Sequence, residues 1–439
     1  MSTIHTISNS GESADYRATD LWTPSHGAFD SNLALARVED FATKVSAAGH
    51  EVTDVMYDST VRMITDSYNK FEDSKPDREL AGGHAFIVPT RIRPDVKALN
   101  EAYRSLPILE AIDEARFNPE VAAQFGSFAL KLLEALPPKI IDRYEGSPGA
   151  VIYAPLTSLL LEDFASTTDA IAEARYIVSQ TVGFAERLGA EVAGLGATIP
   201  SLTNYGRAIK LPEDGKMVVT TGHGGTAWLA GNIAAEAYLN NNDDTRSLGI
   251  VGLGAMGSVL AETVSAMLPD AEIAVYDHNT ALIEKTKANL GNRVIAAKSM
   301  EDVMARSSVI LSALTSQIDL SSVPRELIEG KTIVDDSQPG AFSRQQVIDM
   351  GGRLLWVVAQ STNGLSRETD LNFGGTLRTQ RDFFGCEAEA AVIATLSEDD
   401  RSKAAIRQAA TLDQVMNIGR LFKANHIIPS EPQSYGQPA

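Results

Sequence analysis

The stretch SLGIVGLGAMGSVLAETVSAML, residues 247–268, decides the fold of this chain. It reads as a short apolar strand, a turn with Gly252, Gly254 and Gly257 in the spacing G-x-G-x-x-G, and an apolar helix. The first glycine permits the tight turn, the second lets the backbone approach a pyrophosphate, and the third lets helix and strand pack closely. Because the helix N-terminus then faces the phosphates, the stretch predicts a Rossmann-type dinucleotide-binding domain.

An acidic residue at the end of the next strand completes this motif. The segment AEIAVYD ends at Asp277, where a carboxylate hydrogen-bonds both ribose hydroxyls and repels a 2′-phosphate. No arginine follows to bind such a phosphate, so we predict NAD(P)H as cofactor, with NADH slightly favoured over NADPH. The predicted cofactor contacts are Gly252, Gly254, Ala255, Met256, Gly257, Asp277, His278 and Asn279. The alternative is that Asp277 or Asn279 only caps the helix TALIEKTKANL, which leaves the preference open.

The predicted fold class is α/β, a Rossmann-type doubly wound parallel sheet plus a mainly helical N-terminal substrate domain. The predicted division has four parts. Residues 1–83 form an N-terminal extension that is partly disordered and then helical, and residues 84–243 form a substrate (acyl) domain. The Rossmann domain spans 244–360, and a C-terminal helical segment with the candidate nucleophile spans 361–439.

Individual elements follow from periodicity and from glycine and proline positions. Helices are expected at 31–71 (one or two), 94–136, 168–188 and 223–239, and the region between Gly149 and Gly196 is expected to be largely helical. Strands are expected at 84–90, 216–222, 293–297, 308–314, 331–337 and 353–359. The segments 74–83 and 240–244 read as a linker and a hinge-like break.

Composition excludes several classes of protein. The 439-residue chain is 44% hydrophobic and carries one cysteine, which excludes a disulfide framework and a thiolate-rich metal site, so no metal is expected. The net charge of −19 argues against nucleic acid as a partner. The short basic stretches at 91–97 and 131–143 read as solvated surface. With no signal peptide and no apolar run near ~18 residues, we expect a soluble, cytoplasmic protein without an integral membrane segment.

The single cysteine, Cys386, lies in RDFFGCEAEAAVIA at the expected start of a helix. A free cysteine usually packs as a small apolar residue, but a helix N-terminus favours the thiolate. A thiolate accepts an acyl group from a thioester, and a reduced nicotinamide then delivers hydride to it. Helical spacing should turn Glu387 and Glu389 away from the thiol. The predicted chemistry is therefore reduction of an acyl thioester to an aldehyde.

Five stretches, in this order, resemble the aldehyde-forming long-chain acyl-[acyl-carrier-protein] reductases. They are LPPKIIDRYEGSPGAVIYAPL, LGATIPSLTNYG, VVTTGHGGTAWLAGNIAAEA, the Rossmann segment and RDFFGCEAEA, between about His84 and Leu396. The resemblance implies that Cys386 is the acyl-accepting nucleophile and that the substrate is an acyl thioester, carried on acyl carrier protein or coenzyme A. The chain departs from the family at His278, where the mostly NADPH-linked members have an arginine, and in its N-terminal extension.

Further candidate residues lie between a predicted strand end and helix start. His223 would protonate or stabilise the developing alkoxide, or is an exposed loop histidine. The backbone N–H groups of Gly224, Gly225 and Thr226 would form an oxyanion hole, bind a diphosphate or make a tight turn. Ser201 and Tyr205 are candidate substrate contacts in a polar loop, and residues 152–161 form either core or part of an acyl tunnel.

Two other functions remain open from the residues alone. One is a hydroxyacid-type dehydrogenase or imine reductase, which GLGAMG and VYDHN also resemble, with Cys386 merely packed. The other is a non-enzymatic dinucleotide-binding scaffold whose N-terminal extension recruits a partner. A homo-oligomer is compatible with all three functions.

Overall fold

The computed structural model describes the greater part of the chain, in two compact units. It describes residues 31–49, 51–72, 79–90, 136–157, 168–209, 216–241, 247–314, 316–337, 340–369, 373 and 376–439. The first unit comprises Met1–Lys75, Pro89–Lys139 and Tyr153–Thr181, and the second comprises Pro76–Val88, Ile140–Ile152 and Val182–Ala439. The expected helix at 94–136 and hinge at 240–244 fall wholly or largely outside the described residues, as does the chain before residue 31.

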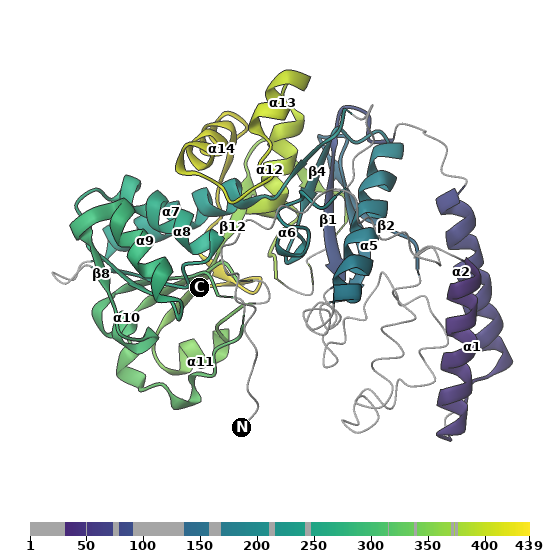
Figure 1. Ribbon diagram of the computed structural model, residues 1–439, viewed down its shortest axis with the longest axis horizontal. Helices are drawn as coiled ribbons and strands as arrows, with labels where there is room; N and C mark the ends of the chain where they lie inside the picture. Colours follow the sequence, from purple (N-terminus) through teal and green to yellow (C-terminus); the bar gives the residue numbers. More distant parts are fainter. Residues whose placement is uncertain are drawn as a thin grey trace. The chain divides into compact units, whose positions relative to one another are not determined.

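Two helices of the first unit confirm the expected helical pattern at 31–71. They are α1 (Ser31–Ala47) and α2 (Asp54–Glu72), which pack against each other (Figure 1). On α1, Ala34, Val38, Phe41 and Val45 are buried, a spacing of three to four residues that places them on one helix face. Helical amphipathicity therefore sets the contact face of this pair.

Five strands from the part of the chain before the glycine motif, and one from after it, form a six-stranded sheet. Its strand order is β13-β2-β3-β1-β4-β5. The strands are β1 (His84–Thr90), β2 (Lys139–Glu145), β3 (Ala150–Thr157), β4 (Val192–Leu195), β5 (Val218–Thr220) and β13 (Ser366–Arg367). β4 pairs in parallel with both β1 and β5, whereas β13 runs antiparallel to β2. The prediction of a strand at 84–90 is confirmed.

The expectation of largely helical structure from Gly149 was wrong for β3. Ala150, Val151, Ile152, Ala154 and Leu156 are all fully buried, because β3 lies inside the sheet. A continuous apolar run of this kind fits a buried strand as well as a buried helix. The expected helices after it are confirmed as α5 (Thr168–Arg187) and α7 (His223–Asn240), with a short α6 (Ile199–Leu202) between them.

The second sheet confirms the Rossmann fold. Its order is β11-β10-β9-β6-β7-β8, and all its pairs are parallel. The strands are β6 (Leu248–Val251), β7 (Ile273–Tyr276), β8 (Val294–Ala296), β9 (Val309–Ser312), β10 (Thr332–Asp335) and β11 (Arg353–Trp356). The helices between them are α8 (Ala255–Met267), α9 (Thr280–Leu290), α10 (Met300–Arg306) and α11 (Arg344–Asp349). The strand order reverses between β6 and β9, where such sheets bind dinucleotides.

The C-terminal part contains strands as well as helices. The stretch RLLWVVA, expected as one strand, divides at Val357 into β11 of the Rossmann sheet and β12 (Val358–Ser361) of another sheet. β12 pairs antiparallel with β14 (Asp382–Phe384) and β15 (Ile427–Pro429). The remaining elements are α12 (Gly385–Ala394), α13 (Glu398–Ala404), α14 (Leu412–Ala424), β16 (Gln433–Ser434) and β17 (Gln437–Pro438).

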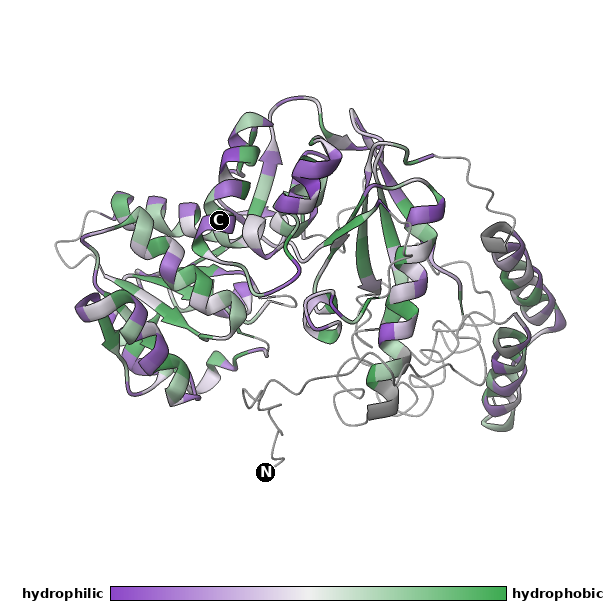
Figure 2. Ribbon diagram, turned by 45° about the horizontal axis from the view of Figure 1, so that its top comes forward, coloured by the Kyte–Doolittle hydropathy of each residue, from purple (hydrophilic) through white to green (hydrophobic). Residues whose placement is uncertain are grey.

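Helix α7 packs against α8, α12 and α14; Figure 1 shows it beside α8. Its first half is almost entirely buried. The strands of both large sheets are mainly hydrophobic, as Figure 2 shows, so each sheet carries a core of its own. Among the described helices, none is long and apolar enough to cross a membrane.

Candidate active site

The glycine motif forms a tight loop with an open face. Gly252 has φ +87°, and an added Cβ there would lie 2.6 Å from the Ala313 carbonyl oxygen. A Cβ on Gly257 would lie 1.8 Å from the Gly252 carbonyl oxygen, so only glycine fits. At Gly254, the N-cap of α8, an added Cβ would meet nothing within 4 Å. This open space beside the helix N-terminus suits a pyrophosphate, so the loop fits a dinucleotide.

Asp277 lies where the ribose-binding acid was predicted, and its carboxylate also holds the glycine loop. Its Oδ2 accepts the Leu253 N–H at 2.7 Å, and its Oδ1 accepts the Asn279 N–H at 2.7 Å. The residue is 7% exposed, whereas the His278 side chain is largely exposed. Asn279 caps α9 by accepting the Ala281 N–H. The helix cap is therefore Asn279, and Asp277 keeps further acceptor capacity for a ribose.

We expect Asp277→Ala to weaken the binding of both dinucleotides and to shift the NADH/NADPH affinity ratio toward NADPH, by about tenfold. The affinity for both cofactors should fall because the Leu253 N–H loses its acceptor. The affinity ratio should shift toward NADPH because the carboxylate no longer repels a 2′-phosphate. Fluorescence titration with both cofactors measures the two effects separately. Asn279→Ala, which removes only the helix cap, should leave the ratio unchanged. An unchanged ratio in Asp277→Ala would show that the carboxylate serves the loop alone.

Cys386 lies in the first turn of α12, as expected, and directly against the start of α7. It is the one residue of the ten in Gly385–Ala394 that is not buried. A Cβ added at Gly222 would lie 2.0 Å from Cys386 Cβ, and Gly222 has φ +73°. A Cβ on Gly225 would lie 2.4 Å from the Gly385 carbonyl oxygen. These glycines therefore let the first turns of α7 and α12 meet in close contact, with the thiol at their junction.

Glu389 links these two helix starts. Its Oε2 accepts the Gly225 N–H at 2.7 Å, and its Oε1 accepts the Gly222 N–H at 3.2 Å and the Thr220 hydroxyl. The side chain is fully buried, and burial raises the pKa of its carboxyl group. The bonding groups around it are all donors, which suits an ionised carboxylate. Glu389 therefore fixes α12, and with it Cys386, against α7.

This arrangement argues against the expected oxyanion hole at Gly224, Gly225 and Thr226. The Gly225 N–H donates to Glu389, and the Thr226 N–H donates to the Gly222 carbonyl. The Gly224 N–H also donates to Glu389 and offsets a part of the rise in pKa that burial causes for this carboxyl group. These N–H groups already have acceptors inside the protein, so they serve the helix start and not a substrate oxygen.

We expect Glu389→Gln to lower the free energy of unfolding by about 1–3 kcal/mol. The amide keeps one acceptor oxygen but turns an NH2 group toward donors, which leaves buried N–H groups without acceptors. Denaturant titration monitored by circular dichroism measures the loss. Glu398→Gln, which removes an exposed ion pair to Lys216, should change stability by less than about 0.5 kcal/mol. Equal stability of the two variants would contradict the role of Glu389.

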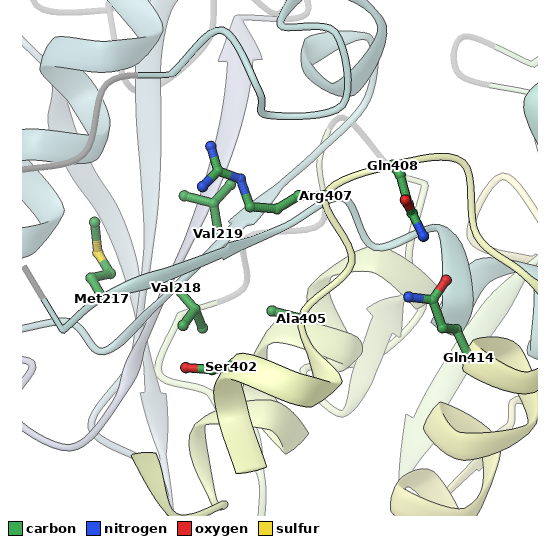
Figure 3. A pocket seen from close by; sticks show the side chains of 8 residues that line it. All are labelled: Met217, Val218, Val219, Ser402, Ala405, Arg407, Gln408 and Gln414. Atoms are coloured by element: carbon green, nitrogen blue, oxygen red, sulfur yellow. The ribbon is translucent and has the colours of Figure 1, made fainter. Parts of the chain in front are cut away.

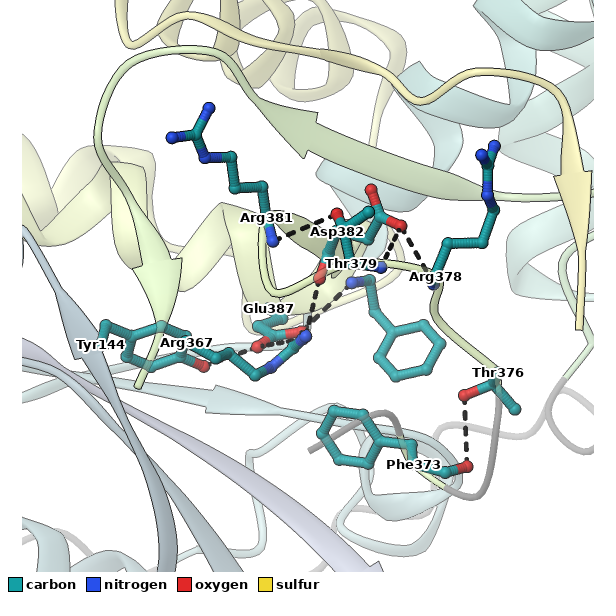
Figure 4. A network of polar contacts seen from close by, with 10 residues as sticks. Tyr144, Arg367, Phe373, Thr376, Arg378, Thr379, Arg381, Asp382 and Glu387 are labelled. Carbon is teal, nitrogen blue, oxygen red and sulfur yellow. Dashed lines mark hydrogen bonds and ion pairs between the residues drawn. The ribbon is translucent and has the colours of Figure 1, made fainter. Parts of the chain in front are cut away.

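Glu387, the residue after Cys386, belongs to a separate buried network (Figure 4). Both of its carboxylate oxygens accept from one nitrogen of Arg367, Nη2, at 2.8 and 2.7 Å. Glu387 also accepts the Tyr144 hydroxyl at 2.7 Å and the Phe384 N–H at 3.1 Å. Arg367 and Glu387 are fully buried. Because Arg367 neutralises Glu387, this carboxylate does not oppose a thiolate at Cys386, in agreement with the expected turn away from the thiol.

His223 follows Gly222, so the close contact at Gly222 brings it near Cys386. Its Nδ1 is buried without a partner among the described residues, and burial lowers the pKa of its imidazole from 6.5 to about 4. Its ring meets that of Tyr205 edge-on, with centroids 5.7 Å apart. Ser201 is exposed on α6 and is not among the partners of His223. The structure therefore brings together the rings of His223 and Tyr205, and Cys386 lies against Gly222, the residue before His223. Part of the 152–161 stretch is strand β3.

Several residues of this site were missed from the sequence. Gly222, Arg367 and Tyr144 carry no local motif, and Gly222 and Tyr144 lie far from Cys386 along the chain, whereas Glu389 follows it by three residues. The one available signal was the pair of acids spaced at one and three residues after the cysteine. In the described ranges, no group of three His, Cys, Asp or Glu residues is placed to hold a metal ion.

Comparison with protein families supports the nucleotide site. Residues 247–351 match the NAD binding domain of 6-phosphogluconate dehydrogenase. The match covers the glycine loop, Asp277 and the parallel strands up to β10. It spans less than half of the chain. The chain therefore carries an NAD(P)-binding domain, and a dehydrogenase-like oxidoreductase is the class of protein that this domain supports. A comparison with curated proteins finds no match.

Solved structures show only distant likeness. The NAD-dependent malic enzyme of Thermotoga maritima is 11% identical, with a TM-score of 0.33, over 84% of this chain and 90% of that chain. The quinate dehydrogenase of Corynebacterium glutamicum is 12% identical, with a TM-score of 0.31, over 78% and 98%. A dipicolinate synthase of Bacillus halodurans is 11% identical, with a TM-score of 0.27, over 41% of this chain. The match spans 61% of the length of that synthase chain.

Proposed function

We propose that this protein reduces an acyl thioester to an aldehyde with NAD(P)H, through an acyl group bound to Cys386, in the manner of the acyl-[acyl-carrier-protein] reductases that its sequence resembles. The observation that carries the proposal is the placement of Cys386. It is the one residue of α12 that is not buried, and it lies at the junction of two helix starts. A cysteine that only filled core space would be buried like its neighbours.

The proposed reaction has two steps. The Cys386 thiolate attacks the carbonyl carbon of the thioester, the carbon–sulfur bond to the carrier breaks, and the carrier leaves as a thiol after taking up a proton. A reduced nicotinamide, when bound, supplies the hydride for the second step. The acyl carbon accepts that hydride, the oxyanion on the hemithioacetal collapses, and the aldehyde leaves while Cys386 returns to the thiolate.

The neighbouring residues have defined tasks in this proposal. Glu389 and the Arg367–Glu387 pair hold α12 so that the thiol stays at the helix junction. His223, neutral at physiological pH because burial lowers its pKa to about 4, donates a ring N–H to the developing oxyanion. The glycine loop and Asp277 hold the dinucleotide, and we propose NADH as the slightly preferred form because no arginine follows Asp277.

We expect His223→Gln to lower turnover without changing the pH dependence of the rate between about pH 5.5 and 8. The folded-state pKa of about 4 lies below the ordinary 6.5, so lowering the pH through 6.5 does not charge this imidazole. The measurement is kcat against pH for both proteins, with an acyl thioester and NADH. If the wild-type rate showed an ionisation near pH 6.5 that disappeared in His223→Gln, the imidazole of His223 would not stay neutral in this pH range, and the proposed role would be wrong.

The test of the proposed function is the intact mass of the full chain after incubation with an acyl-coenzyme A and no reductant. A mass increase of one acyl group, located at Cys386 by peptide mapping and discharged as aldehyde when NADH or NADPH is added, is the expected result. An unacylated protein that still binds dinucleotide would favour a dehydrogenase without covalent catalysis. A comparison of acyl-coenzyme A with acyl-[acyl-carrier protein] identifies the carrier. A cytoplasmic location and a homo-oligomeric state complete the proposal.

A further inference from the structure

A separate pocket lies at the outer edge of the first sheet, on β5, the strand that leads into Gly222. Its volume is about 410 Å³. One part of its lining is apolar, and the other carries groups that form hydrogen bonds. The apolar residues are Met217, Val218, Val219 and Ala405, and the polar ones are Ser402, Arg407, Gln408 and Gln414 (Figure 3). The lining comes from β5, from α13 and the segment after it, and from the first turn of α14.

Arg407 is the charged residue of this pocket, and among the described residues it forms no ion pair. Its Nη2 donates to the Gly206 carbonyl oxygen at 2.6 Å. Its Nε is buried and has no described hydrogen-bond partner. A guanidinium has five N–H donors in a planar fork, and in the described part of the chain only Nη2 of Arg407 has an acceptor. In a chain of net charge −19, a partly buried cation with no carboxylate paired to it among the described residues is unusual.

The guanidinium is also held in place before any ligand binds. Its bond to the Gly206 carbonyl oxygen holds the guanidinium itself, and the Arg207 Nε holds the backbone of the same residue by donating to the Arg407 carbonyl oxygen at 3.1 Å. Figure 3 shows the guanidinium close to Val219, with the amides of Gln408 and Gln414 on the other side of the pocket. A side chain fixed in this way loses little conformational entropy when it binds an anion.

We propose that this pocket binds a small molecule with a carboxylate and a short apolar body. A carboxylate matches the planar donor geometry of Arg407, and the valines offer an apolar surface to the rest of the ligand. The amide of Gln414 contributes further N–H groups, since its oxygen already accepts the Thr411 N–H. The volume lies at the small end of the range for ligand sites, about 300–1,000 Å³. This site does not depend on the proposed reaction at Cys386.

Titration calorimetry of the full chain with hexanoate, and with hexan-1-ol as the uncharged control, tests the proposal. Saturable binding of hexanoate, at least about tenfold tighter than that of hexan-1-ol, is expected. Arg407→Gln should weaken hexanoate binding by about tenfold or more, and Arg420→Gln, an exposed arginine outside the pocket, should not. Absence of saturable binding by the wild type, or equal affinity in Arg407→Gln, would overturn the proposal.

A second pair of variants covers the case in which Arg407→Gln does not fold. Ser402 is exposed on α13 and lines the pocket, so Ser402→Glu should fold and place a repelling carboxylate beside the ligand. Lys403→Glu changes the net charge by more but lies outside the lining. Ser402→Glu should weaken hexanoate binding by at least about tenfold and Lys403→Glu by much less. If both variants weakened hexanoate binding equally, the overall charge of the protein would attract hexanoate and this pocket would not be its binding site. If Ser402→Glu bound hexanoate as the wild type does, hexanoate would bind elsewhere on the protein.

Discussion

Cys386→Ser is expected to abolish acylation and to lower aldehyde formation by about a thousandfold or more. A serine hydroxyl in the same first turn of α12 does not ionise as a thiol does, and neither of the two acids that follow it is free to activate it: Glu387 is paired with Arg367, and Glu389 is bound to the start of α7. The substitution removes no hydrogen-bonded group from the glycine loop, so NADH binding should be unchanged.

Three measurements separate the possible outcomes for Cys386→Ser. Steady-state turnover, intact mass after incubation with an acyl thioester, and NADH affinity are each compared with the wild type. Loss of acylation with retained NADH binding supports covalent catalysis. If the variant keeps most of its turnover, hydride transfer does not pass through an acyl-cysteine, and the hydroxyacid-type dehydrogenase becomes the better description.

Gly257→Ala should weaken dinucleotide binding on the order of 100-fold. Its Cβ would lie 1.8 Å from the Gly252 carbonyl oxygen, and that oxygen belongs to the backbone of the turn itself. The turn cannot move away freely, because Gly252 is already held at φ +87° against Ala313. The start of α8 must therefore separate from β6, which should also lower the melting temperature.

Gly254→Ala is the matched control for this prediction. An added Cβ at Gly254 meets no protein atom within 4 Å, so the melting temperature should equal that of the wild type. Binding should nevertheless fall, because the Cβ would occupy the space next to the pyrophosphate. Fluorescence titration and thermal unfolding of both variants give the two quantities. A Gly254→Ala protein with wild-type affinity would show that the open space beside α8 is not the pyrophosphate site.

The Rossmann domain could be predicted from the sequence because its signals are local. The glycine spacing, the acid after β7 and the alternation of apolar strands with helices all lie within residues 247–359. Each of these features reflects a backbone requirement or the period of one element. The same reasoning predicted the starts of α7 and α12. It failed where periodicity is ambiguous, as in the fully buried β3, and where one apolar run, RLLWVVA, serves two sheets.

The environment of Cys386 was decided by the tertiary structure alone. The expectation that Glu387 and Glu389 would both leave the face of the thiol was wrong for Glu389, because a residue three positions on shares the helix face of Cys386. Glu389 accepts the N–H of Gly222, the residue that lies against Cys386. Helical periodicity also did not indicate what either acid would meet. Glu389 meets the start of α7, which is 167 residues away at Gly222, and Glu387 meets Tyr144, which is 243 residues away. A residue pattern records that a side chain is buried and not which distant backbone covers it. The order of the strands and the packing of α7 on α12 bring these groups together, and that order depends on the whole chain.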